Sequence, residues 1–404
     1  MVTVSVRSAP AELGRRWQRL PDRQLVVAAL GVWLSSRVAF AFAIWAGLFV
    51  DHPTTAARRT SFADAMYRWD AGWYLRIAQH WYFWPPFQQD RLGYGQGHIA
   101  FLPLPPLLIK ITQLFTGSFA LAGLLVSAAA SAIALVALVR LVRLELGDLP
   151  DQLRDTGARA APLLLAFSPY AVFLFLPYSE PVFLACAIPG WLAARQNRWR
   201  TAGLCLAGAT AAKVNGLFLV AAVVVLYVQQ RRQDGLPLFR PVVLWLLVPL
   251  TTIGAYFYYL HARTGDWNAW QHAQDRSWHR TPHGLWESWT ITWHSAFGAG
   301  TETDYAWSRR AELLAAVLGL ILIVVLLIYR RWAEALYITL SWFALASNGV
   351  YLSFPRSTLL WFPAFILLAR AVAHRRWLLQ GILSVTAPLA FVLGAAWASS
   401  AWVN

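Results

Sequence analysis

Residues Phe119–Val142 read FALAGLLVSAAASAIALVALVRLV, an apolar run whose one charged residue, Arg140, stands near its end. About 20 such residues form a helix that crosses a hydrocarbon core about 30 Å thick. None of the long apolar runs alternates with a period of two, which excludes the strands of a membrane barrel. The sequence therefore predicts an all-α, polytopic integral membrane protein. The other runs of this kind are Gln24–Val50, Ala160–Leu176, Pro241–Leu260, Glu312–Ile328 and Trp377–Trp402.

The composition agrees with this class. Of the 404 residues, 58% are hydrophobic and 13% are charged, whereas soluble domains carry about 25% charged residues. The formal net charge is +15, but the Arg residues form short groups between the apolar runs, as the positive-inside rule produces. No nucleic-acid partner is therefore expected. Cys186 and Cys205 lie within apolar segments, so neither a disulfide framework nor a metal site is expected.

The Arg-rich segments predict the topology, because cytoplasmic loops are enriched in Lys and Arg. With these segments inside, about eleven transmembrane helices follow, with the N-terminus cytoplasmic and the C-terminus outside. The Arg-rich segments are Arg7–Arg23, Arg140–Arg159, Arg195–Arg200, Arg231–Arg240, Arg330–Arg331 and Arg375–Arg376. The expected spans are about 25–50, 119–142, 160–177, 179–194, 201–213, 216–229, 241–260, 311–329, 332–350, 357–373 and 377–401.

We expect a single membrane domain over 1–404, with four regions outside the regular spans. They are a basic cytoplasmic N-terminus (1–23), a first outer loop with an interfacial helix (51–97), a Pro-rich hairpin (98–116) and a long outer loop (261–309). Segments 201–213 and 216–229 are too short to cross a bilayer, so they are interpreted as an interrupted hairpin with its tip at 212–216. Broken helices of this kind often mark binding sites.

The first outer loop holds the principal catalytic candidate. Trp69, Trp73, Ile77 and Trp81 recur every four residues, with Met66 one turn earlier, which predicts an amphipathic helix on the outer membrane surface. Asp70 lies at the edge of this apolar stripe. A partly desolvated carboxylate there would be basic enough to accept a proton. The alternative is that Asp70 only pairs locally with an Arg.

Further charged groups are expected on the outer side, where a charge close to lipid is by default a functional candidate. Glu180 either caps the next helix or forms the wall of an outward cavity. Lys213, beside Asn215, suits a phosphate oxygen, and Arg356 suits an anion because it starts an apolar span on the outer side. The long outer loop adds residues that could grip an anion or stack on sugar, or that form an ordinary aromatic belt: Arg263, Asp266, Gln274, Arg276 and Trp278.

Five blocks of the sequence form a recognisable series: Arg68-Trp69-Asp70 through Ile77-Ala78, Ala100-Phe101-Leu102-Pro103-Leu104-Pro105-Pro106-Leu107-Leu108, Tyr178-Ser179-Glu180, Arg263-Thr264-Gly265-Asp266 with Gln274 and Trp278, and Pro355-Arg356. In this order they resemble the second mannosyltransferases of GPI-anchor synthesis and their bacterial homologues. The patterns of that family are approximately R-W-D-A…I-A, A-F-F-P-L-Y-P-L-L and Y-S-E. Lys213, Leu102, Pro105 and Ser357 depart from its usual residues, which leaves donor and acceptor identity open.

The resemblance implies a GT-C-class glycosyltransferase of about eleven transmembrane helices. Such enzymes take sugar from a polyprenyl-phosphate donor on the outer leaflet, and an acid in the first outer loop acts as general base in an inverting transfer. Carried over, this acid is Asp70, and Glu180 is the second choice as base or else positions the acceptor. The candidate substrate- and phosphate-binding residues are Arg68, Tyr74, His98, Tyr178, Ser179, Lys213, Asn215, Arg263, Asp266, Gln274, Arg276, Trp278 and Arg356.

The functional hypothesis is thus a mannosyltransferase of the plasma (inner) membrane with its site on the extracytoplasmic side. Its expected partners are a polyprenyl-phosphate sugar donor, membrane lipid and a glycan or glycolipid acceptor. No cofactor or metal is expected, since Arg and Lys suffice for a monophosphate leaving group. Three alternatives stay open: a transporter or flippase for a lipid-linked sugar, a non-catalytic membrane subunit, and a protein O-glycosyltransferase of the same fold.

Overall fold

The computed structural model describes residues 19–50, 61–83, 97–300, 303–399, 401 and 403. These residues are helical throughout, apart from connections and one isolated bridge between Pro282 and Asn348. The all-α class predicted from the sequence is confirmed. The helices are α2 (Arg19–Val50), α3 (Phe62–Met66), α4 (Asp70–His80), η1 (Gly97–Ala100), α6 (Leu104–Thr116), α7 (Phe119–Glu145), α8 (Asp151–Ala166), η2 (Ala171–Leu174), α9 (Ser179–Arg195), α10 (Trp199–Ala212), α11 (Asn215–Gln233), η3 (Pro241–Leu247), α12 (Val248–Thr264), α13 (Ala269–Trp278), α14 (Leu285–Phe297), α15 (Thr303–Ile328), α16 (Trp332–Ala346), α17 (Phe354–Ser357), η4 (Thr358–Leu360), α18 (Phe362–His374) and α19 (Trp377–Ala398).

Five of these helical segments are long and apolar enough to cross a membrane. A sixth candidate is the pair Phe354–Leu360 and Phe362–His374, which is bent by 68°. The expected count of eleven spans is not confirmed, because several of the expected spans are helices of only 14 to 17 residues: α8, α9, α10 and α16. The five candidates are Asp22–Phe49, Phe119–Glu145, Pro241–Thr264, Ala306–Ile328 and Trp377–Ala398.

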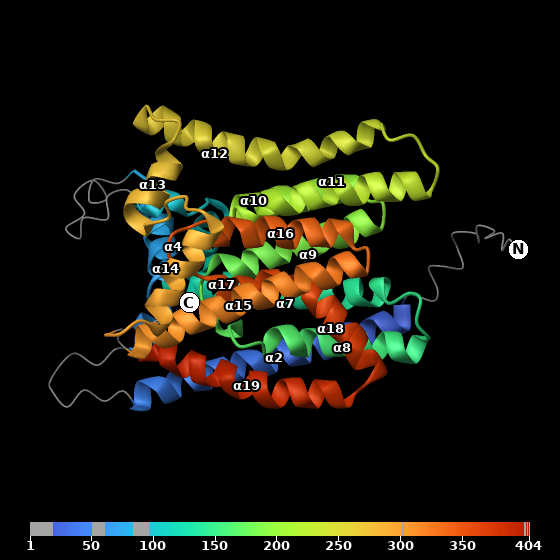
Figure 1. Cartoon of the computed structure of the whole chain (residues 1–404), viewed down its shortest axis with the longest axis horizontal. Helices are drawn as coiled ribbons and strands as arrows, with labels where there is room; N and C mark the ends of the chain where they lie inside the picture. Colours follow the sequence, from blue (N-terminus) through green and yellow to red (C-terminus); the bar gives the residue numbers. More distant parts are fainter. Residues whose placement is uncertain are drawn as a thin grey trace, which may run out of the picture.

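The long helices run side by side along one axis of the molecule (Figure 1). Glycines allow two of the closest approaches. A Cβ on Gly47 of α2 would lie 2.2 Å from the carbonyl oxygen of Ala395 on α19, and one on Gly203 of α10 would lie 2.2 Å from that of Trp245. Helices in lipid associate through such small residues, because apolar side chains gain little by leaving the acyl chains.

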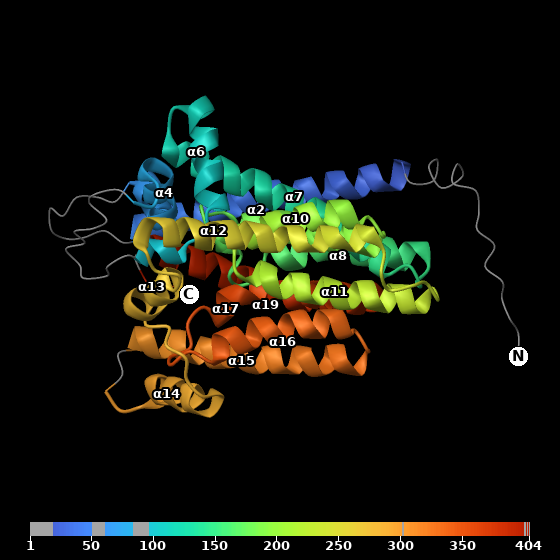
Figure 2. The same ribbon diagram turned by 90° about the horizontal axis from the view of Figure 1, so that it is seen from above.

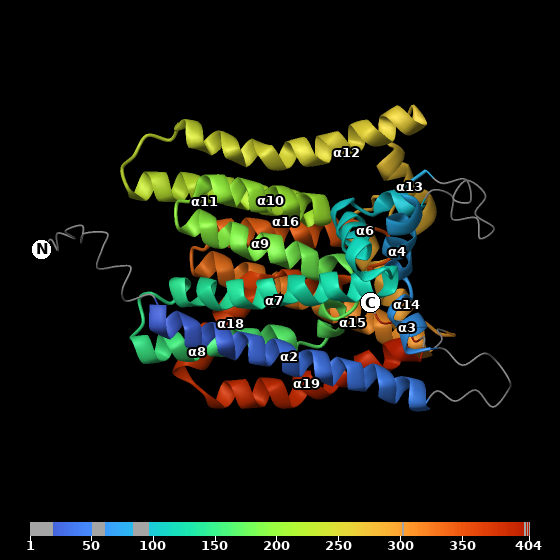
Figure 3. The ribbon, with the colours of Figure 1, turned by 180° about the vertical axis from the view of Figure 1, so that it is seen from behind.

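The two ends of the bundle differ. Helices α4, α6, α13 and α14 gather at one end, which we call the α4 end (Figures 1, 2 and 3). The connections α7–α8, α9–α10, α11–η3, α15–α16 and α18–α19, which carry most of the Arg-rich segments, lie at the opposite end (Figures 1 and 3). There, Glu145 of α7 pairs with Arg195 at 2.6 Å and with Arg331 at 2.8 Å, so that ion pairs join three helices.

The first outer loop differs from the expected continuous amphipathic helix. Helix α3 ends at Met66 and α4 begins at Asp70, because Trp69, with φ of 55°, breaks the helical path between them. Met66 is therefore not one turn before the α4 stripe. Ile77 and Tyr74 are buried within the bundle, whereas Trp69 is 43% exposed. Residues 51–60 and 84–96 of this loop lie outside the described ones.

The Pro-rich segment forms η1 and α6. Pro105 and Pro106 stand in the first turn of α6, where a helix needs no N–H donor, and Gly117, with φ of 69°, ends the helix before α7. Helix α6 lies at the α4 end, so the chain enters and leaves this segment at the same end (Figures 2 and 3). The second expected irregularity is the break between α10 and α11 at residues 213–214.

Candidate active site

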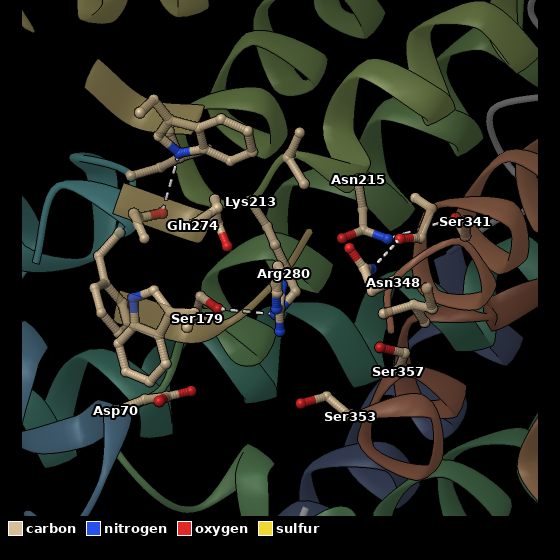
Figure 4. Close-up of a pocket in the computed structure, with 18 of the residues that line it drawn as sticks. Asp70, Ser179, Lys213, Asn215, Gln274, Arg280, Ser341, Asn348, Ser353 and Ser357 are labelled. Carbon is tan, nitrogen blue, oxygen red and sulfur yellow. Dashed lines mark hydrogen bonds between the residues drawn. The ribbon is translucent and has the colours of Figure 1, made fainter. Parts of the chain in front are cut away.

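A cavity of about 430 Å³ lies where α4, the start of α9, the α10–α11 break, α13, the end of α16 and α17 meet (Figure 4). It is built from segments that are far apart in the sequence. Many of the residues singled out in the sequence line it: Asp70, Tyr74, Ser179, Lys213, Asn215, Gln274, Trp278 and Arg356.

Four charged side chains form a network at this cavity. Arg356 donates from a terminal guanidinium nitrogen to Oδ2 of Asp70 at 2.8 Å, and its Nε lies 3.1 Å from Oε1 of Glu180. Lys213 donates from Nζ to the same Oε1 at 2.8 Å. Two acids and two cations thus balance in a region where Glu180 is 1% and Arg356 8% exposed. Asp70 does pair with an Arg, but that Arg is 286 residues away and not local.

Arg356 is fixed from several sides. Its guanidinium lies over the rings of Phe173 and Tyr178, 5.3 Å from each ring centre, a favourable cation–π position. The short helix α17 that carries it is anchored by the buried Glu312 of α15, whose carboxylate accepts hydrogen bonds from the N–H groups of Ser353 and Phe354, both at 2.7 Å. Hydrogen bonds to a charged acceptor are among the strongest in proteins, so the position of Arg356 is well determined.

Asp70 is positioned by the residues before it. Arg68 does not line the cavity; it donates to the carbonyl oxygens of Trp397 and Ala398 at the end of α19, where a cation also suits the helix dipole. Trp397 in turn donates from Nε1 to the carbonyl of Ala65 at 2.9 Å. The turn that leads into α4 is thereby held on α19, and Asp70 stands at the first residue of α4 with its side chain 20% exposed.

The walls of the cavity combine aromatic faces with uncharged polar groups. Trp270 and Trp278 of α13 donate from Nε1 to the carbonyls of Ala100 and Gly97, which fixes their rings against η1. Asn215 lies 3.5 Å from the hydroxyl of Ser341. Amides and hydroxyls can form hydrogen bonds with sugar hydroxyls. Aromatic rings can stack on the apolar faces of sugars.

Other predicted residues lie behind the walls. Glu180 and Tyr178 contact Arg356 from within the bundle. His98 is buried, with Nε2 2.6 Å from the carbonyl oxygen of Tyr82, so it supports η1 and does not line the cavity. These three side chains shape the site without facing it.

Three residues of the long outer loop point elsewhere. Arg263 lies over the ring of Phe83, and Arg276 is exposed on α13. Asp266 accepts from the N–H of Asn268 and pairs with His272 at 2.7 Å; these contacts hold the pKa of Asp266 below its usual range. Since α13 turns Trp270, Gln274 and Trp278 toward the cavity at a spacing of four residues, Arg276 falls on another face.

Sequence reasoning missed Arg280, which lines the cavity with Asn348, Ser341 and Ser353. A signal was present, since Arg280 is a further cation in an expected outer loop, where cations are unusual. Asn348 and Ser341 gave no signal, because each lies in or beside an apolar run and its neighbours in space come from other helices.

Comparisons with known proteins find a matching sequence family and a similar solved structure. The sequence model of the family described as Mannosyltransferase (PIG-V) matches residues 51–240, which include Asp70, Glu180 and Lys213 and end before Arg280 and Arg356. The chain is similar to the crystal structure of the Archaeoglobus fulgidus oligosaccharyltransferase in the apo form, with 12% identity and a TM-score of 0.41. The alignment covers 92% of this chain and 56% of the oligosaccharyltransferase, so the chain spans a little over half its length.

No curated protein matches the chain. The family match supports a glycosyltransferase. Residues 51–240 match the model of the PIG-V mannosyltransferase family, which confirms the resemblance read from the motifs in this part of the chain; the blocks at 263–278 and 355–356 lie outside the match.

Proposed function

We propose that the chain is an inverting mannosyltransferase of the GT-C class. It transfers a sugar from a polyprenyl-phosphate donor to a hydroxyl of a glycan or glycolipid acceptor at the extracytoplasmic face of the plasma membrane. The observation that carries this proposal is the carboxylate of Asp70, which opens into a cavity of about 430 Å³ while Arg356 holds its other side at 2.8 Å.

The two oxygens of Asp70 have different surroundings. Oδ2 accepts from Arg356, whereas no described residue donates a hydrogen bond to Oδ1. The hydrogen bond from Arg356 fixes the orientation of the carboxylate, as a general base requires. Oδ1 is therefore the atom that takes the proton of the acceptor hydroxyl.

The proposed reaction is a single displacement. The acceptor oxygen forms a bond to the anomeric carbon as its proton passes to Asp70, and the bond from that carbon to the phosphate oxygen breaks. The electron pair of the broken bond stays on the departing polyprenyl phosphate, where positive charge stabilises it. Attack from the face opposite the leaving group inverts the configuration.

Glu180 is assigned a positioning role. Its side chain is 1% exposed, it does not line the cavity, and it contacts both Lys213 and Arg356. A carboxylate held by two cations behind the wall cannot reach an acceptor hydroxyl. Of the two acids that the sequence left as candidates, we therefore assign the base to Asp70.

The side of the membrane is proposed from the two ends of the bundle. The cavity lies toward the α4 end, and the Arg-rich connections lie at the opposite end (Figure 1). Cytoplasmic loops carry an excess of Arg and Lys, which supports a cavity that faces away from the cytoplasm. A donor anchored by its prenyl chain would present its phosphate near that interface.

The test is transfer from labelled polyprenyl-phosphate mannose in membranes that contain the chain. We expect Asp70→Asn to lower transfer at least about 100-fold, because Asn cannot accept the proton and general bases contribute about 10²–10⁴ in rate. Asp64→Asn, a matched change at an exposed carboxylate of α3, keeps wild-type transfer. Wild-type turnover by a folded Asp70→Asn variant, judged by its melting temperature and elution volume, would remove Asp70 from the base role.

A further inference from the structure

Arg280 is held rigidly at the cavity. Its N–H donates to the carbonyl of Gln274 at 3.1 Å, and two residues further on Pro282 forms an isolated bridge with Asn348. The N–H of His283 then donates to the carbonyl of Ser347 at 2.8 Å. The backbone on both sides of Arg280 is therefore fixed, and its side chain projects into the cavity (Figure 4).

The guanidinium of Arg280 has no partner in the part of the chain that the structure describes: no hydrogen bond, ion pair or ring contact involves it. The other two cations at the cavity differ in this respect. Lys213 is bound to Glu180, and Arg356 to Asp70 with Glu180 alongside.

Among the described residues that line the cavity, Arg280 is a cation that no carboxylate contacts. Asp70 and Glu180 pair directly with Lys213 and Arg356, whereas Asp70 and Glu312 act on Arg280 only through their charge, without a hydrogen bond or ion pair. Burial and the positive charge of Arg356 lower the pKa of the Arg280 guanidinium, yet Arg remains protonated in proteins. A cation without a contacting counter-charge in a partly dry site is unfavourable, so Arg280 would stabilise an anion bound in the cavity.

We infer that Arg280 binds the phosphate of an isoprenoid phosphate monoester in this cavity. The planar guanidinium offers two parallel N–H donors, a fork that fits two phosphate oxygens. Lys213 and Arg356, which the sequence suggested for this role, already neutralise carboxylates. The inference rests on the proposed function for the identity of the phosphate carrier, and it concerns the same site: during transfer, Arg280 would stabilise the charge that develops on the departing phosphate.

The test measures binding of farnesyl phosphate to the purified full-length chain in detergent, through fluorescence of the cavity residues Trp270 and Trp278 and through the rise in melting temperature. We expect Arg280→Gln to weaken binding of farnesyl phosphate about 10–100-fold, as for loss of a charge-assisted bidentate contact. The affinity of Arg280→Lys should lie between those of the wild type and Arg280→Gln. Farnesol, which lacks the phosphate, binds weakly and equally to wild type and variant. Inorganic phosphate is added as a competitor of farnesyl phosphate. Competition would show that the site recognises the phosphate group alone, and lack of competition would show that it requires a lipid-linked phosphate.

The matched control is Arg76→Gln, which removes an exposed guanidinium of α4 that lies over Trp73 and outside the cavity. It keeps wild-type affinity for farnesyl phosphate. Without ligand, Arg280→Gln melts no lower than wild type, because the guanidinium it removes has no partner; a lower melting temperature would mean a structural role and would overturn the inference. Equal affinity of Arg280→Gln and wild type for farnesyl phosphate would also overturn it.

This inference and the proposed function fail in different ways. A wild-type chain that binds farnesyl phosphate through Arg280 but transfers no mannose contradicts the proposed function and upholds the phosphate site. A chain that transfers mannose with the same donor KM in wild type and Arg280→Gln contradicts the phosphate site and upholds the proposed function.

Discussion

At the scale of single residues, the site depends on a chain of ion pairs from Asp70 through Arg356 and Glu180 to Lys213. Each member has an opposite charge beside it, and Glu180 is the most buried. Removing one partner of a buried pair leaves an uncompensated charge, which costs about 3–5 kcal/mol. The same network orients Asp70, the proposed base, and supports the fold around it.

We expect Glu180→Gln to lower the free energy of unfolding by about 3 kcal/mol, because it leaves Lys213 without a carboxylate. Adding Lys213→Met to this variant removes the stranded charge, so the double variant is less destabilised than the two single effects predict. Unfolding of the purified variants in detergent, followed by circular dichroism, gives the double-mutant cycle. Glu287→Gln, at an exposed position of α14, stays within about 0.5 kcal/mol of wild type. Strict additivity would show that the two charges do not interact.

At the scale of the elements, the break between α10 and α11 brings Lys213 and Asn215 to the cavity. Gly216 makes this break possible. A Cβ there would lie 2.4 Å from backbone atoms of Thr210, a distance that no side-chain shift can relieve. The glycine is required for the close approach of two backbones.

Gly216→Ala is expected to destabilise the protein by about 1–3 kcal/mol, as overpacking does, and to lower mannosyl transfer because Lys213 moves with the break. Gly254→Ala in α12 is the matched control, since a Cβ at Gly254 meets nothing within 4 Å. There, alanine keeps transfer and raises stability by up to about 1 kcal/mol through its helix propensity. Thermal unfolding and the transfer assay measure both effects. If the two variants behaved alike, the close approach at Gly216 would have no consequence for the site.

At the scale of the whole molecule, the bundle is polarised. The cavity and the short helices α4, α13 and α14 lie toward one end, and the Arg-rich connections with their ion pairs lie at the other (Figures 1 and 3). This separation suits a membrane protein whose two ends face different compartments.

Labelling of single cysteines tests this orientation. In a chain with Cys186 and Cys205 replaced by Ala, Glu287→Cys on α14 and Asp234→Cys after α11 introduce thiols at exposed positions near opposite ends. In intact cells or right-side-out vesicles, we expect a membrane-impermeant maleimide to label only the cysteine at 287, and after permeabilisation to label both. Labelling of the cysteine at 234 alone in intact membranes would reverse the proposed orientation and place the cavity on the cytoplasmic side.

The helical class could be predicted because it depends on local pattern: long apolar runs need no knowledge of their neighbours. The number of membrane spans could not be predicted from the sequence. The length of an apolar run says neither that residues 354–374 are bent by 68° nor that α10 is only 14 residues long. The break at Lys213 was visible because a charge and a glycine interrupt an apolar run within a few residues.

What the sequence determined by itself was the class of fold and the motifs at 51–240 that match the family, and it singled out Asp70 as the candidate base, since each depends on contiguous residues. The tertiary structure decided the pairing of charges, because Asp70 and its partner Arg356 are 286 residues apart. The tertiary structure also decided that Arg280, and not Arg276, lines the cavity. Helix α13 ends at Trp278, and His279, with φ of 50°, turns the chain so that Arg280 enters the cavity while Arg276 stays exposed. The direction of a side chain is set by such turns and by contacts between distant helices, which composition does not contain.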